Sequence, residues 1–148
     1  MSLTYRKATL ADLNQYLIWA NDPLVRSNAI HQESISLDDH TAWFKNKLQH
    51  PQTELFVFEQ EGSLVGQIRL DQEPDGFWLI DYSVDPNYRG KGLGTEMMRM
   101  IMLQKKLKFR ALVKENNHSS RRVFEKLNFT WIQTITLHHQ QFDQYEKG

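Results

Sequence analysis

The sequence predicts an α/β fold in which helices pack on a mixed β-sheet, and three observations support that prediction. The length of 148 residues suits one domain with one core, so we expect a single domain over residues 1–148. Hydrophobic residues make up 40% of the chain and charged residues 24%, as in globular proteins. Apolar spacing switches between strand and helix periods in the order β-α-α-β-β-β-α-β-α-β-β.

The first part of the chain predicts one strand followed by two helices. Residues 4–7 form a short strand, and residues 9–12 resemble a capping-box variant that opens a helix with regularly spaced leucines. The run Asn21-Asp22-Pro23 ends that helix. Residues 24–35 are expected to be irregular, and residues 36–48 form the second helix.

The rest of the chain alternates strands and helices around tight turns. Two strands at residues 54–60 and 63–70 are joined by Glu61-Gly62, which is a hairpin signal. The remaining elements are a strand at 77–84, a helix at 93–103, a strand at 110–113, a helix at 119–127, and strands at 130–137 and 142–146.

Composition excludes several classes of protein and site. Basic and acidic residues number 18 each, which argues against a nucleic-acid binder. The absence of cysteine excludes disulfides, thiolate metal sites and a cysteine nucleophile. No apolar run has transmembrane length, and the N-terminus lacks the apolar region of a signal peptide. We therefore expect a cytoplasmic enzyme with neither a nucleic-acid nor a membrane partner.

The most informative segment is a glycine-rich turn, RGKGLG at residues 89–94, which lies between a predicted strand and a predicted helix. Such a turn presents several backbone N–H groups to an anion, and the helix dipole adds partial positive charge. Arg89 and Lys91 add full positive charges at the same place. Glycine also lets a phosphate approach without a Cβ in its way. The segment therefore predicts a phosphate-bearing ligand.

Two common phosphate loops do not fit this turn. A P-loop needs Gly-Lys-Ser/Thr after its last spacer, whereas Gly94 is followed by Thr95 and Glu96. A dinucleotide fingerprint needs G-x-G-x-x-G, and its third glycine position holds Thr95 or Met97 in the two possible registers. An ordinary glycine turn that caps a helix is the remaining alternative.

The pattern Arg-x-x-Gly-x-Gly after Val-x-Pro resembles the acyl-CoA pyrophosphate loop of the GNAT superfamily of N-acetyltransferases. Residues 117–129 resemble a second motif of that family, and the order of elements matches over nearly the whole chain. The resemblance implies a mostly antiparallel sheet of six to seven strands, splayed between the fourth and fifth, with about four helices. It implies acetyl-CoA as co-substrate, no metal, and direct acetyl transfer to an amine in a ternary complex. The residues that it assigns to the cofactor are Val84, Arg89, Gly90, Lys91, Gly92, Leu93, Gly94, Thr95, Asn117 and Phe124.

The second motif departs from the family pattern at two positions. Phe124 occupies the usual tyrosine position, and Asn128 occupies the usual glycine position that ends the helix. Asparagine tolerates the left-handed conformation and can still cap a helix. Phenylalanine cannot donate a proton, so the usual acid is missing. Tyr82, Ser83 and His118 are candidate replacements, or the thiolate leaves without an acid.

Residues 19–26 and the stretch from Ile35 to Phe44 resemble the acceptor half of bacterial acetyltransferases that act on nucleotide-linked amino sugars. Ribosomal-protein N-terminal and small-amine acetyltransferases share this W-x-N-D/H-P stretch. A non-catalytic acyl-CoA-binding module is the alternative to an enzyme. For an enzyme, the acceptor is expected to be a small-molecule amine, a nucleotide-sugar first, with a protein N-terminus or a polyamine as alternatives. Its expected contacts are Arg26, Asn28, His31 and His40. The plainer interpretation of Arg26 is a solvated side chain, and that of His31 and His40 is a surface or capping histidine. The chain is expected to be a monomer or homodimer.

Asp81 is the sequence candidate for the base that accepts the amine proton. Strand alternation places Asp81 and Ser83 on one face and Tyr82 and Val84 on the other. Burial of a carboxylate in an apolar strand would make it a stronger base. The alternative is a structural carboxylate paired with Arg69 or Arg110. A backbone N–H near Ser83 or Val84 is expected to face the oxyanion, as the resemblance implies.

Four further positions carry weaker signals. His138-His139 looks like a metal pair, but the two side chains are expected to point to opposite faces of a strand, and no third ligand is near. Trp43 and Phe44 on the second helix are expected to belong to the core rather than to a stacking platform.

Overall fold

A computed structural model describes residues 2–148 as seven strands, five α-helices and two short 3-10 helices. The sheet order is β1-β2-β3-β4-β5-β7-β6. All neighbouring strands pair antiparallel except β4 and β5. In chain order the elements are β1 Leu3–Lys7, η1 Leu10–Asp12, α1 Leu13–Ala20, α2 Pro23–Ser27, α3 Leu37–Gln49, β2 Thr53–Gln60, β3 Ser63–Gln72, β4 Trp78–Val84, η2 Pro86–Tyr88, α4 Leu93–Gln104, β5 Phe109–Lys114, α5 His118–Lys126, β6 Thr130–Leu137 and β7 Gln140–Lys147.

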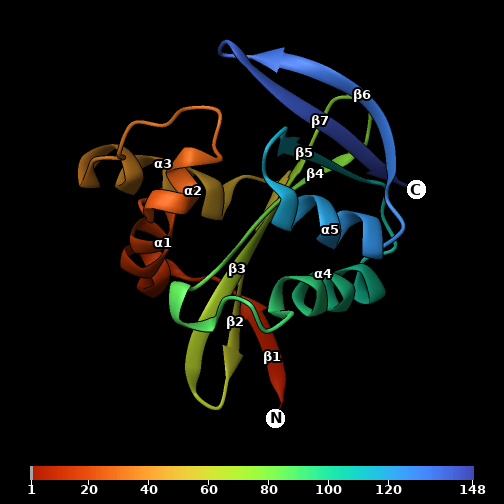
Figure 1. Ribbon diagram of the computed structural model, residues 1–148. Helices are drawn as coiled ribbons and strands as arrows, with labels where there is room; N and C mark the ends of the chain where they lie inside the picture. Colours follow the sequence, from red (N-terminus) through yellow and green to blue (C-terminus); the bar gives the residue numbers. More distant parts are fainter. Residues whose placement is uncertain (1) are drawn as a thin grey trace.

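Helices cover both faces of the sheet and leave a core on each side (Figure 1). Helices α4 and α5 cover the larger core, in which Met97, Met98 and Ile101 are fully buried. Helices α1 and α3 cover the smaller core around Trp19 and Phe44. The mixed sheet with helices on both faces confirms the predicted fold class.

The sheet opens between its two parallel strands. Strand β4 pairs with β5 only at Trp78–Phe109 and Leu79–Arg110, so the strands diverge beyond Leu79. The closed end is fastened by Arg110, whose guanidinium makes ion pairs of 2.7 Å with carboxylates on two loop residues and on β7. This splay confirms the expected gap between the fourth and fifth strands and sets the place of the site.

The structure corrects two details of the predicted elements. Residues 23–27 are helical rather than irregular, because Pro23 occupies the first turn and Asp22 caps it by accepting from the N–H groups of Leu24 and Val25. The pair His138-His139 has φ of 49° and 63° and forms the β6–β7 turn, not part of a strand. Asn128 adopts the expected left-handed conformation, with φ of 64°. None of the helices in residues 2–148 is long and apolar enough to cross a membrane.

Candidate active site

A cavity of about 900 Å³ begins at the glycine-rich turn, passes the gap between β4 and β5, and reaches the segment after α1. It brings together most of the residues expected from the sequence. Those on its wall are Arg26, Asn28, His31, His40, Asp81, Tyr82, Ser83, Val84, Arg89, Gly90, Gly92, Leu93, Gly94, Thr95, Asn117 and Phe124. Lys91 is exposed and does not line it.

The glycine-rich turn has the backbone that an anion site requires. Gly90 and Gly92 have φ of 79° and 76°, and a Cβ at either position would meet no atom within 4 Å. Gly92 is the N-cap of α4, so the first N–H groups of the helix have no partner within it, and the residues of that turn line the cavity. The turn therefore fits a pyrophosphate by main-chain contact.

The charged side chains of the turn, Arg89 and Lys91, already contact other residues, so the expectation that both charges are free for a phosphate needs correction. Arg89 makes an ion pair of 2.8 Å with Asp22 and donates from Nε to the carbonyl of Val84 at 3.1 Å. Lys91 Nζ lies 5.5 Å from the centroid of the Tyr88 ring. Burial acts to raise the pKa of Asp22, but Arg89 and the helix N–H groups hold that pKa below its ordinary value. Arg89 thus anchors the turn to α2.

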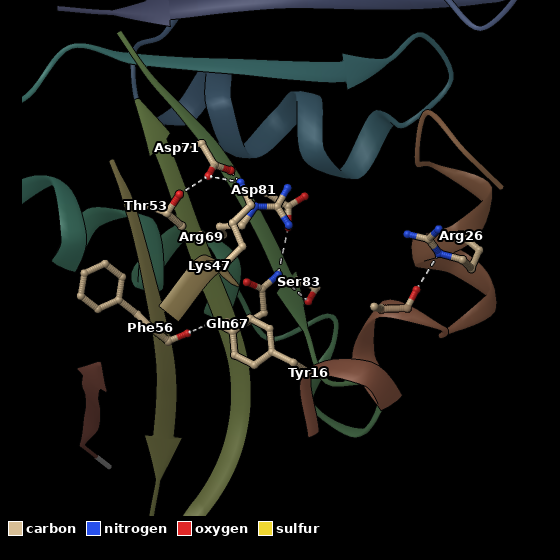
Figure 2. A network of polar contacts seen from close by, with 11 residues as sticks. Tyr16, Arg26, Lys47, Thr53, Phe56, Gln67, Arg69, Asp71, Asp81 and Ser83 are labelled. Atoms are coloured by element: carbon tan, nitrogen blue, oxygen red, sulfur yellow. Dashed lines mark hydrogen bonds and ion pairs between the residues drawn. The ribbon is translucent and has the colours of Figure 1, made fainter. Parts of the chain in front are cut away.

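Asp81 lies on the cavity wall with 52% of its side chain exposed, so the expected burial is wrong. Its Oδ2 accepts from Gln67 Nε2 at 3.1 Å and lies 4.0 Å from Arg69 Nη1 (Figure 2). The face that carries Asp81 opens to the cavity because β4 has left β5. The carboxylate therefore remains accessible from the cavity.

The polar network behind Asp81 fixes its position. Figure 2 shows Arg69 between two carboxylates, with Asp71 Oδ2 at 2.8 Å from its Nε. Asp71 in turn accepts from Lys47 Nζ at 2.9 Å and from Thr53 Oγ1 at 2.7 Å. The Arg69 guanidinium also lies 5.2 Å from the centroid of the Trp43 ring. Arg110 has no part in this network, so of the two arginines expected to pair with Asp81 only Arg69 does.

Arg26 stabilises the acceptor segment, which is residues 24–43, where the acceptor is expected to bind, and does not stand free in solvent. Its Nε donates to the carbonyl of Ala20 at 2.6 Å (Figure 2), and its Nη1 donates to the carbonyls of His31 and Glu33 at 2.9 and 3.3 Å. Three backbone carbonyls are satisfied this way. The expectation of a solvated arginine is therefore wrong, and the use of its charge for a phosphate is limited.

The β6–β7 turn packs against the acceptor segment. The rings of His31 and His138 lie 4.8 Å apart. Gln140 accepts from Gln32 Nε2 at 3.2 Å and donates to the carbonyl of Ile30 at 3.4 Å. His31 thus lies at the rim of the cavity, exposed and in contact with the turn. Within residues 2–148, no three histidine, aspartate or glutamate side chains converge so that they could hold a metal ion.

His40 is a core residue, neither on the surface nor at a cap. It is 2% exposed, and its Nε2 donates to the carbonyl of Leu13 at 2.9 Å, which ties α3 to α1. Its ring stacks on Phe44 at 5.6 Å. Burial lowers the pKa of His40, against the opposing effect of that hydrogen bond. Phe44 is fully buried as predicted, whereas Trp43 is partly exposed and lines the cavity.

The first turn of α5 contributes two polar groups to the cavity. Asn117 is the N-cap, and its side chain accepts from the N–H of Ser120 at 3.3 Å. Ser120 Oγ lies 2.9 Å from the Tyr82 hydroxyl. His118 is exposed and lies outside the cavity wall, so the structure does not bring that candidate acid to the site.

Among the cavity residues that sequence reasoning missed are Trp43 as a wall residue, Gln67, Arg69 as the neighbour of both Asp71 and Asp81, and Ser120. A polar residue at every second position of β3 was an available signal, since Gln67, Arg69 and Asp71 share one face of that strand. Trp43 and Ser120 gave no comparable signal.

A family model described as an acetyltransferase (GNAT) domain matches residues 2–130. The chain belongs to the GNAT acetyltransferase family. It is accordingly an acyltransferase that uses acetyl-CoA as co-substrate, and the open turn at Gly90 and Gly92 fits the pyrophosphate of that molecule. A search of curated proteins found no match to this GNAT chain.

Solved structures with the same fold include enzymes with different acceptors. An N-acetyltransferase from Staphylococcus aureus Mu50 is 23% identical, with a TM-score of 0.83 and coverage of 99% of this chain and 98% of that one. The structure of AAC(6')-Ib in complex with ribostamycin and coenzyme A is 20% identical, with a TM-score of 0.84 over 99% and 93%. A spermidine N-acetyltransferase from Vibrio cholerae, in complex with CoA and spermine, is 17% identical, with a TM-score of 0.84 over 97% and 92%. At these identities the likeness establishes the fold of this GNAT enzyme and leaves its acceptor open.

Proposed function

We propose that this enzyme transfers the acetyl group directly from acetyl-CoA to a primary amine of an amino sugar, with both substrates bound at once. The observation that carries the proposal is the single cavity that joins the glycine-rich turn, the exposed carboxylate of Asp81 and the acceptor segment. Such an arrangement lets the amine attack the thioester without a covalent enzyme intermediate, and holding both reactants together supplies much of the rate.

Asp81 is the proposed proton acceptor. An ammonium group must lose a proton before its nitrogen can attack the thioester. A general base within hydrogen-bond reach, or one water away, accelerates that step. The Asp81 carboxylate is fixed from behind by Gln67 and Arg69 and is open to the cavity in front. The β4 backbone near Ser83 and Val84, beyond the last pairing with β5, is the proposed donor to the oxyanion.

The nucleotide-linked form of the sugar needs cationic partners for its phosphates. Arg26, the partner expected from the sequence, has few N–H donors left for them. Arg26 donates to three carbonyls, and Lys114 Nζ donates to the carbonyl of Ser27 at 2.6 Å. In the amino-sugar proposal, therefore, the sugar and its amine supply most of the recognition, and His31 at the rim is the candidate contact for a phosphate.

A small polyamine is the second candidate acceptor, and two carboxylates favour it. Glu33 and Asp39 line the cavity, and within residues 2–148 neither makes an ion pair within 4.0 Å. A second ammonium group on the acceptor could pair with either one. A protein N-terminus has no comparable observation in its favour.

A panel assay tests the proposal. Release of CoA thiol is measured with acetyl-CoA and a nucleotide-linked amino sugar, a free aminoglycoside, spermidine or an N-terminal peptide. Amino sugars are expected to give the highest kcat/KM. A clear preference for spermidine establishes the second candidate, and acetylation of the peptide alone overturns both.

The acceptor segment can be tested separately with the best amine of that panel. Arg26→Ala frees three carbonyls and loosens the segment, so it should raise the acceptor KM about tenfold and leave the KM for acetyl-CoA unchanged, the scale of one lost charged hydrogen bond. Arg99→Ala, on the exposed side of α4, is the matched control. Equal acceptor KM values for the two variants would place the acceptor elsewhere.

A further inference from the structure

The reaction leaves one proton unassigned, because the departing thiolate needs one and Phe124 has none to give. The Phe124 ring is 2% exposed and packs against Tyr82, Phe129 and Tyr145, with ring centroids 5.0 to 6.4 Å away. Its position is filled and apolar. An acid at this end of the cavity must therefore come from another element.

Tyr82, on β4, places its hydroxyl against the face of α5 that carries Phe124. It lies on β4 beyond Leu79, in the part of the strand that has left β5. Its hydroxyl is 2.9 Å from Ser120 Oγ. Ser120 precedes Phe124 by four residues, so the two lie one above the other on one helix face. All three side chains line the cavity.

The ring of Tyr82 is held by the glycine-rich turn as well as by α5. A Cβ added at Gly94 would lie 2.9 Å from Tyr82 Cε2. Gly94 therefore makes room for the phenol, which fills the space between the start of α4 and the start of α5. The two helix N-termini expected to hold the cofactor both contact this tyrosine.

We propose that Tyr82 donates the proton to the departing thiolate and that Ser120 is its positioning residue. The inference rests on the proposed direct transfer. The amine nitrogen forms the new C–N bond, the C–S bond breaks, and sulfur keeps that electron pair and takes the proton from the Tyr82 hydroxyl. Ser120 donates to the phenolate, which regains a proton from solvent, while the proton of the amine leaves through Asp81.

The surroundings of the phenol suit a donor that is protonated until sulfur departs. Burial raises the pKa of Tyr82 above its ordinary value, against the effect of Ser120, and Asp81 raises it further. The O–H form therefore persists at neutral pH. Ser83, another candidate acid, is less suited, because its side chain is buried on the opposite face of β4 and accepts from Gln67 Nε2 at 3.1 Å.

The experiment moves the hydroxyl between strand and helix. Six variants are compared: Tyr82→Phe, Phe124→Tyr, the double variant with both changes, Ser120→Thr, and Ser120→Ala in the wild-type and Tyr82→Phe backgrounds. CoA thiol release gives kcat and KM, calorimetry gives the Kd for acetyl-CoA, and thermal melting checks the fold. Each rate is measured with an amine and with water alone as the acceptor.

Tyr82→Phe should lower kcat by about 100-fold, the usual scale for loss of a general acid, with the Kd for acetyl-CoA changed less than about threefold. The double variant should regain at least about tenfold, because the helix again supplies a hydroxyl. Ser120→Ala should lower kcat in the wild type, Ser120→Thr should restore it, and Ser120→Ala should have no effect once Tyr82 is Phe.

A Tyr82→Phe enzyme within threefold of the wild-type kcat overturns the assignment. So does a Ser120→Ala effect of equal size in both backgrounds, which marks Ser120 as a structural residue only. Failure of the proposed function is a separate result: the wild type then acetylates no amine in the panel, while the ratio of the variants in the water reaction still reports on Tyr82.

Discussion

Replacing Asp81 with asparagine separates its proposed chemical role from a structural one. The change keeps the size of the side chain and an oxygen for Gln67, but it removes the basic site. Loss of a general base lowers kcat by about 100-fold or more, which is about 2.7 kcal/mol in the barrier. The structural loss is much smaller, because the side chain is 52% exposed and its ion pair with Arg69 spans 4.0 Å. Exposed pairs of this kind contribute at most about 1 kcal/mol.

Activity should therefore fall far more than stability. We expect the melting temperature of Asp81→Asn to change by only a few degrees, since about 1 kcal/mol corresponds to roughly 2–4 °C in a chain of this size. The matched control is Asp38→Asn, an exposed carboxylate on α3 that does not line the cavity.

The assay is CoA thiol release at neutral pH for the wild type and both variants. A near-normal rate for Asp81→Asn would refute the reasoning. Asp81 would then be a structural carboxylate in the Arg69 network, and the amine would lose its proton to solvent.

Three further changes test the turn, the core and the sheet. Gly92→Val places a branched side chain at a φ of 76° and in the open space of the turn, so acetyl-CoA should bind at least about tenfold more weakly by calorimetry while circular dichroism is unchanged. His40→Gln should lose less stability than the wild type between pH 7 and 5. The pKa of His40 in the folded protein is below its ordinary value of 6.5, so the unfolded chain binds more protons at this residue. The stability of the wild type therefore falls as the pH falls below 6.5. Equal acid sensitivity in urea titrations contradicts this. Gly66→Ala should cost about 1–3 kcal/mol in thermal melts, because its Cβ would lie 2.6 Å from the carbonyl oxygen of Ser83; an unchanged melting temperature shows that β3 and β4 can move apart.

Periodicity in the sequence was enough to place the strands and most helices, and it failed where one residue serves two roles. The run Asn21-Asp22-Pro23 ends α1 as predicted, but the same Asp22-Pro23 pair also caps and begins α2, where an irregular segment was expected. A proline at the first helical position and a stop before proline have the same local pattern. Nothing in the short segment itself distinguishes them.

The site was predictable where the backbone decides and less so where partners decide. The glycine turn was found because glycine spacing reflects positive φ, which Gly90 and Gly92 show. The exposure of Asp81 was missed, because alternation tells which face of β4 carries a residue but not that this face opens beside the splay. Arg26 bonds to carbonyls of its own segment, and the sequence contains no signal for that.

His40 shows a prediction that the sequence could have supported. It precedes Phe44 by four residues, so both lie on one face of α3, and Phe44 was already expected in the core. A histidine at helical spacing from a core aromatic is more simply a buried residue with one satisfied nitrogen than a ligand contact, and the bond to Leu13 bears this out.

Asp22 connects the two substrates of the enzyme before either is bound. One carboxylate caps α2, whose following segment belongs to the proposed acceptor side, and also holds Arg89 of the turn on the acetyl-CoA side. A second tie runs from Trp19 Nε1 to Asp85 Oδ2 at 2.9 Å, just before the turn. We therefore expect binding at the turn and binding beside α2 to be coupled, and thermodynamic linkage makes such an effect reciprocal. Each substrate should then tighten the binding of the other through the helix cap that their two sides share.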